Sequence, residues 1–357
     1  MRVYEQIWAI FWLLTSLGLI NSCQARPVVK PFATGLNQPR GMAFDAAGNL
    51  YVAETGAPDP TDPGNVQPEI NHSARILRID RTGKSTTVIT GLPYTHYISA
   101  GDSGATDVAI INNDLYVLTG EGYDDQWSRS VLRIAPDEAG QPSVQPVANL
   151  LTFAQAYLDI ASQMSVAASN PYAMITTPDG SAFYVTDGAS GRVLRVALGG
   201  AVQLLAELLN QPPLTGLTIG PDSALYFAMF SPSPHNAGSG SIWRVNGTGE
   251  VTLAVAGLTM PIDVGFAPSD LGQAQTLYVL EFSQAQPTGF PYVANTGRLL
   301  RIHPNGAHTV ILDHLNYPTA MLFDATGDLY LAVGGAFVAP GKGAILRVPC
   351  TLLRASC

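Results

Sequence analysis

Acidic side chains recur at two kinds of place in this sequence. Four of them follow short Leu-Tyr-Val-like segments: Glu54, Glu121, Asp187 and Glu281. Two others stand at turns that lead into a second kind of apolar segment: Asp107 and Asp263. Carboxylates gathered around one axis repel each other, so they favour a hard cation, a raised pKa or a partner such as Arg40. We predict a metal site at Asp107, Asp263, Glu54 and Glu281, with Ca²⁺ as the candidate ion. The alternative is that each carboxylate bonds to the backbone of its own turn.

Other chemistries have weaker signals. The histidines stand mainly in expected loops, without ligand spacing: His72, His96, His235, His303, His308 and His314. A quinone-dependent sugar dehydrogenase would need a catalytic histidine and basic quinone-binding residues, and the pattern places neither. A gluconolactonase-like enzyme would need a carboxylate and asparagine around one divalent metal, which Asn170 with Asp107 and Asp263 would allow. The segment Gly101-Asp102-Ser103-Gly104 lacks the spacing of a serine nucleophile motif.

A repeated unit positions these side chains. Each copy has an apolar segment, a turn, a Leu-Tyr-Val-like segment, a variable loop and an aliphatic-Arg-aliphatic segment. The arginines of the six copies are Arg78, Arg133, Arg195, Arg244, Arg301 and Arg347. Short β-branched segments, such as Thr252–Val255, lie between copies. Four short strands per unit, repeated six times, predict an all-β fold, a six-bladed β-propeller.

The two ends of the repeat indicate how the ring closes. The last copy stops at its third strand, Ile345–Val348, whereas Val28–Ala33 offers a spare strand before the first copy. We expect this N-terminal strand to complete the last blade and remove an open edge. The arginines, one per blade at the same place, indicate a scaffold role. The spacing of apolar residues in Leu150–Ala161 predicts a helix inserted before the third blade.

Composition limits the partners. The chain has 357 residues, 46% hydrophobic and 13% charged, which excludes a disordered protein. Its net charge is −9 and only three lysines occur, so nucleic acid is not an expected partner. We expect a monomer whose partner is a small molecule or an extracytoplasmic protein.

The N-terminus predicts export. Residues 1–25 have one early arginine and an apolar run, Ile7–Ile20, that is too short to span a bilayer. Ile20-Asn21-Ser22-Cys23 resembles a bacterial lipobox, which favours cleavage before Cys23 and a lipid anchor there as the contact with the membrane. Ordinary secretion, with Cys23-Gln24-Ala25 as a loose cleavage site, is the alternative. We expect the propeller to occupy residues 26–349 and a tail to occupy residues 350–357, closed by a Cys350–Cys357 disulfide.

The order of the blade segments, the Gly-Leu-x-x-Pro start at Gly35 and the Asn170-Pro171-Tyr172 turn resemble the ScyD/ScyE family of exported, NHL-like propellers. The resemblance covers about Val28 to Val348 and implies the fold and export, but no catalytic residues. Our leading hypothesis is therefore an exported, lipid-anchored scaffold that binds a ligand or a protein. The alternative is a metal-dependent lactonase or hydrolase, or a sugar oxidoreductase, with its site at the mouth of the channel.

Overall fold

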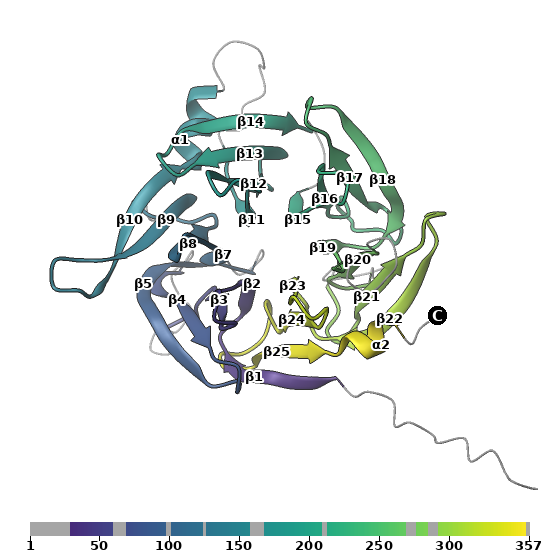
Figure 1. The fold of residues 1–357 in the computed structure, drawn as a ribbon, viewed down its shortest axis with the longest axis horizontal. Coiled ribbons are helices and arrows are strands. Elements are labelled where there is room, and N and C mark those ends of the chain that lie inside the picture. Colours follow the sequence, from purple (N-terminus) through teal and green to yellow (C-terminus); the bar gives the residue numbers. More distant parts are fainter. Residues whose placement is uncertain are drawn as a thin grey trace, which may run out of the picture.

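The computed structural model describes residues 29–59, 69–97, 101–123, 126–157, 168–208, 213–268, 276–284 and 292–354. In these residues the chain forms six antiparallel sheets arranged as blades around one axis, as predicted (Figure 1). No described helix is long and apolar enough to cross a membrane. Cys23 and Cys357 lie outside the described residues, so lipidation and the disulfide remain predictions.

The blades follow one another along the chain, with the innermost strand first. Blade one contains β2 (Pro39–Phe44), β3 (Leu50–Glu54), β4 (Glu69–Ile79), β5 (Ser85–Tyr97) and β6 (Gly101–Ser103). Blade two contains β7 (Ala105–Ile111), β8 (Asp114–Thr119), β9 (Ser130–Pro136) and β10 (Pro142–Asn149). Blade three contains β11 (Pro171–Thr176), β12 (Ala182–Asp187), β13 (Arg192–Ala197) and β14 (Val202–Glu207).

The second half of the ring repeats this arrangement. Blade four contains β15 (Leu214–Ile219), β16 (Leu225–Met229), β17 (Gly240–Val245) and β18 (Val251–Leu258). Blade five contains β19 (Pro261–Phe266), β20 (Leu277–Glu281), β21 (Gly297–Ile302) and β22 (His308–Leu315). Blade six contains β23 (Ala320–Phe323), β24 (Leu329–Val333), β25 (Gly343–Val348) and β1 (Lys30–Leu36).

The first strand closes the ring, as the sequence predicted. β1 pairs antiparallel with β25, so the sixth blade joins the two ends of the propeller (Figure 1). The ring of Phe32 meets that of Tyr330 edge-on, with centroids 5.2 Å apart, and Ala33 and Leu36 are buried between the sixth and first blades. Because β1 supplies both ladder bonds and buried apolar side chains, it is part of the fold.

The core consists of separate apolar layers between neighbouring blades. Alternate residues of a strand point to opposite faces of its sheet, so each strand supplies two layers. Phe227 of β16, for example, is buried against blade three, whereas the next residue, Ala228, is buried against blade five. Each blade thus buries the face of its neighbour, which explains why one domain accommodates the whole repeat.

A tyrosine–arginine pair recurs between the second and third strands of every blade. The paired residues are Tyr51–Arg78, Tyr116–Arg133, Tyr184–Arg195, Tyr226–Arg244, Tyr278–Arg301 and Tyr330–Arg347. In blades two, four and six the arginine also binds an aspartate, as Arg347 binds Asp328. These contacts agree with the scaffold role expected for the repeated arginines.

Two short helices complete the described fold. Helix α1 (Leu150–Tyr157) follows blade two, as predicted, and the Asn149 side chain accepts a hydrogen bond from the Thr152 amide at its start. Helix α2 (Cys350–Arg354) begins within the expected tail, and Leu353 is buried in the layer between blades five and six. This part of the tail therefore packs against the propeller.

Candidate functional site

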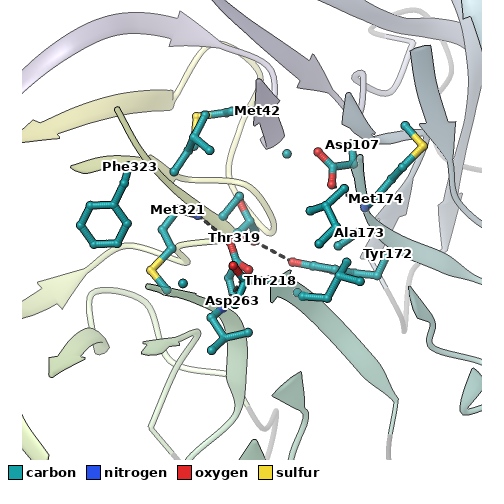
Figure 2. A pocket seen from close by; sticks show the side chains of 18 of the residues that line it. Met42, Asp107, Tyr172, Ala173, Met174, Thr218, Asp263, Thr319, Met321 and Phe323 are labelled. Carbon is teal, nitrogen blue, oxygen red and sulfur yellow. Dashed lines mark hydrogen bonds between the residues drawn. The ribbon is translucent and has the colours of Figure 1, made fainter. Parts of the chain in front are cut away.

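The innermost strands of all six blades line a pocket of about 290 Å³ on the axis of the propeller (Figure 2). Equivalent positions in these strands carry glycine, aspartate and alanine, twice in that order: Gly41, Asp107, Ala173, Gly216, Asp263 and Ala320. Two of the predicted metal ligands, Asp107 and Asp263, therefore do line one cavity. They stand inside strands β7 and β19, however, and not in the turns that the sequence suggested.

Each of these aspartates accepts two backbone hydrogen bonds. Asp107 Oδ1 accepts from the amide of Val108 at 2.8 Å, and Oδ2 accepts from the amide of Met174, in the next blade, at 2.7 Å. Asp263 repeats this arrangement with Val264 at 2.8 Å and Met321 at 2.7 Å. Both carboxylates therefore join their own blade to the next one.

Burial controls the protonation of this pair. Desolvation raises the pKa of Asp107 well above its usual range, against the effect of its two amide bonds, and the charge of Asp263 raises it further. The same cause raises the pKa of Asp263 to about 7. The channel therefore holds less negative charge than two ordinary aspartates would give it.

The other two predicted ligands lie elsewhere, at the ends of second strands. Glu54 is fully buried; it accepts from the Asn37 amide at 2.6 Å and pairs with Arg75. Glu281 is equally buried and accepts from the Thr259 amide at 2.6 Å and from Arg298 Nε at 2.8 Å. Neither residue lines the axial pocket.

Asp187 and Glu121 also take structural bonds. Asp187, at the end of β12, accepts from the Asn170 amide at 2.7 Å, and the Asn170 side chain accepts from the Glu121 amide at 3.1 Å. Among the described residues, no three Asp, Glu, His or Cys side chains come together in a geometry that could hold a metal ion. Calcium is therefore not shown, and the proposed ligand set remains a prediction.

A row of polar side chains crosses the axis at the end of the channel where the innermost strands begin. We call this end of the propeller the upper face. The Tyr172 hydroxyl, from blade three, donates to the Thr319 carbonyl, from blade six, at 2.9 Å (Figure 2). Burial raises the pKa of Tyr172, and the nearby positive charge of Arg40, from blade one, opposes this shift. Tyr172 and Thr319 both line the axial pocket.

A histidine–aspartate pair lies beyond this row. Strands β5 and β6 form a hairpin extension of blade one, and their register places His96 directly opposite Asp102. His96 Nδ1 is 2.5 Å from Asp102 Oδ1, and the Tyr94 hydroxyl donates to the same oxygen at 3.0 Å. Gln38 Nε2 donates to Asp102 Oδ2. Asp102 is thus held from three sides, while the side chain of His96 is 31% exposed.

The hairpin is joined to the channel row through Arg40. Arg40 Nη2 donates to the backbone carbonyl of Asp102 at 3.2 Å, and its Nε donates to Thr55 Oγ1 at 3.1 Å. Gln38 is 3% exposed, and its Oε1 has no hydrogen-bond partner in the described part of the chain. A buried polar atom without a partner calls for an explanation, such as a bound water molecule or a functional role.

This site was not predicted from the sequence, because His96 was expected to lie in a loop, without ligand spacing. The only local signal is alternation: Tyr94 and His96 share one face of an extended segment, and Asp102 stands six residues after His96. The pairing of His96 with Asp102 depends on the register of a hairpin that no motif identifies. A single histidine and a single aspartate form no recognisable catalytic motif, so the sequence pattern did not identify the pair.

Comparison with known proteins supports the fold. No protein-family model matches the chain, and neither does the sequence of any curated protein. Solved structures that resemble it are six-bladed propellers. A Thermus thermophilus protein named as an oxidoreductase (glucose dehydrogenase) has a TM-score of 0.54 and 17% identity, over 90% of this chain and 99% of that one.

Two further solved structures have similar values. A gluconolactonase from Xanthomonas campestris has a TM-score of 0.53 and 14% identity, over 90% of this chain and 89% of that one. The PQQ-bound aldose sugar dehydrogenase of Streptomyces coelicolor has a TM-score of 0.53 and 15% identity, over 90% and 96%. Identities this low establish the propeller fold alone.

Proposed function

We propose that this chain is an enzyme that hydrolyses a small sugar-type lactone on the upper face, with His96 as the general base. The observation that carries the proposal is the pairing of His96 with Asp102, whose side chain is 9% exposed. A carboxylate that accepts from Nδ1–H fixes the histidine tautomer and leaves Nε2 as the basic nitrogen. No hydrogen bond from His96 Nε2 is found among the described residues, and the side chain is partly open to solvent.

The reaction needs only water and these residues. Nε2 takes a proton from a water molecule while the water oxygen bonds to the lactone carbonyl carbon. The ring C–O bond then breaks, and the imidazolium returns the proton to the departing ring oxygen. The product is a hydroxy acid. Asp102 stabilises the transient imidazolium, and Gln38 and Tyr94 hold Asp102 in place.

Among the similar structures, the Xanthomonas campestris protein is named a gluconolactonase, which supports this reaction class. Two others are named as sugar dehydrogenases, and they favour a second candidate. A base at His96 could equally remove the hydroxyl proton of an aldose during oxidation to a lactone. That reaction needs an electron acceptor, which an assay would supply as a quinone.

Other proposals rest on the sequence. A lipid anchor at Cys23, export, membership of the ScyD/ScyE family and a calcium ion at Asp107, Asp263, Glu54 and Glu281 all remain proposals. The reaction described above uses none of them. A scaffold that binds a ligand without turnover is the alternative if no reaction is found.

The test is an assay of acid release from sugar lactones, with and without His96→Gln. We expect His96→Gln to lower kcat by about 10²–10⁴-fold, the usual contribution of a general base. His308→Gln, a change at an exposed histidine on the outer strand β22, is the matched control and should leave turnover unchanged. If the wild type hydrolyses no sugar lactone and oxidises no aldose with added quinone, the enzyme proposal fails.

A further inference from the structure

Arg40 is a cation at the upper end of the channel whose hydrogen bonds go to neutral groups. Its Nε donates to Thr55 Oγ1, and its Nη2 donates to the backbone carbonyl of Asp102. A guanidinium has five N–H donors, so part of its donor capacity remains. Arg40 is also partly buried, which weakens its solvation by water.

Arginines elsewhere in the described fold commonly have a carboxylate within 4 Å. Those with such a partner are Arg75, Arg133, Arg192, Arg244, Arg298 and Arg347. Arg40, like Arg129 and Arg195, bonds instead to neutral groups. The carboxylates close to it in the chain have other partners. Asp102 directs its oxygens to Gln38, Tyr94 and His96, and Glu54 is held by Asn37 and Arg75. Partial burial of a cation without an anion is unfavourable, so the position suits an anionic ligand.

The site of this cation is linked to the proposed base. Asp102 contacts both residues, His96 through its carboxylate and Arg40 through its backbone carbonyl. A molecule bound near His96 Nε2 can therefore present a second group to Arg40, which lies on β2 and contacts the hairpin. Planar guanidinium groups bind carboxylates through two parallel hydrogen bonds, which also fixes the orientation of the ligand.

We propose that Arg40 binds a free carboxylate of the substrate, so the substrate is a lactone of a sugar diacid, or a related sugar acid, and not a neutral sugar lactone. This inference rests on the proposed function for the reaction. The anion site itself stands on the contacts of Arg40 and can be measured without turnover. The assignment makes Arg40 a specificity-determining residue.

The experiment is calorimetric titration of the full chain with gluconate, a sugar monocarboxylate, and with glucose as the neutral probe. We expect gluconate to bind and glucose to bind much more weakly. Arg40→Gln should weaken gluconate binding by at least about tenfold, the effect of losing a charge-assisted pair. Arg40→Lys, which keeps the charge but not the planar geometry, should lose less.

Controls separate this proposal from the reaction. Arg133→Gln changes an arginine in strand β9 whose side chain is 39% exposed, and it should bind gluconate like the wild type. His96→Gln should lose turnover but keep gluconate binding, so a failure of the reaction leaves the anion site testable. Thermal melts identify any variant that does not fold. If Arg40→Gln does not fold, gluconate binding by Arg40→Lys tests the proposal instead. Unchanged gluconate binding in a folded Arg40→Gln, or binding of inorganic phosphate without gluconate, would overturn the proposal.

Discussion

Asp107 and Asp263 occupy equivalent positions three blades apart, and each binds the amide of the following residue and an amide of the next blade. The glycines before them are equivalent too. A β-carbon at Gly41 would collide with the carboxylate of Asp107, and one at Gly216 would collide with that of Asp263. The two halves of the ring thus use the same contact between neighbouring blades. These carboxylates are structural whatever else they bind.

The first prediction concerns the space at Gly41. Gly41→Ala places its methyl group against the side chain and the backbone of Asp107. We therefore expect the free energy of unfolding to fall by about 1–3 kcal/mol. Gly199→Ala is the control, because nothing lies within 4 Å of an added β-carbon there. Denaturant unfolding measures both. Equal stability of the two variants would contradict the close contact between blades one and two.

The second prediction concerns pH. Burial raises the pKa of Asp263 from 3.8 to about 7, so the folded state holds a proton that the unfolded chain has released between these values. The stability from this group is fully present below the unfolded pKa and is lost as pH rises through the folded pKa. We expect the wild type to lose melting temperature relative to Asp263→Asn as pH rises from about 4 to about 8. Parallel melting curves for the two proteins would show that the pKa of Asp263 is not raised.

The repeat made the architecture predictable, because strand order and ring closure follow from patterns that recur six times. The functional residues and their contacts were harder to predict from the sequence. Asp107 lines the axial pocket, but its partner amide belongs to Met174, 67 residues away, and no local pattern specifies that bond. Glu54 and Glu281 were grouped with it because they end similar strands. Their cross-strand arginines, Arg75 and Arg298, hold them in their own blades instead.

The third prediction concerns ring closure. Removing residues 28–34 takes most of β1 from the sixth blade and leaves β25 as an exposed edge. Backbone groups of β25 lose their partners, and Tyr330 loses its contact with Phe32, so we expect aggregation or a large drop in melting temperature. Size-exclusion chromatography and thermal melting measure this. A monomer that melts like the parent protein would show that β1 is dispensable.

The fourth prediction concerns the ion pair of Glu281 with Arg298. Glu281 is almost completely buried, so Glu281→Gln leaves a partly buried arginine without its charge partner. We expect a cost towards the lower end of about 3–5 kcal/mol, because Arg298 is 27% exposed and keeps some water. Asp114→Asn, in the exposed Arg133–Asp114 pair, should cost less than about 1 kcal/mol. If calcium stabilises the wild type and Glu281→Gln removes that effect, Glu281 is a calcium ligand, as the sequence analysis predicted.

The last prediction concerns Asp102, which acts through His96 and not on the substrate. Asp102→Asn can present an amide N–H to His96 Nδ1, which favours the tautomer with the proton on Nε2 and removes the proposed base. We expect a large fall in kcat with a small change in KM, because the ring stays in place but in the wrong protonation state. Tyr94→Phe removes one neutral donor to Asp102 and keeps the buried ring, so its kcat should fall far less. A shift of the pH–rate profile in Tyr94→Phe would show that the hydroxyl tunes the pair. Equal losses in both variants would mean that the hairpin, and not the tautomer of His96, limits turnover.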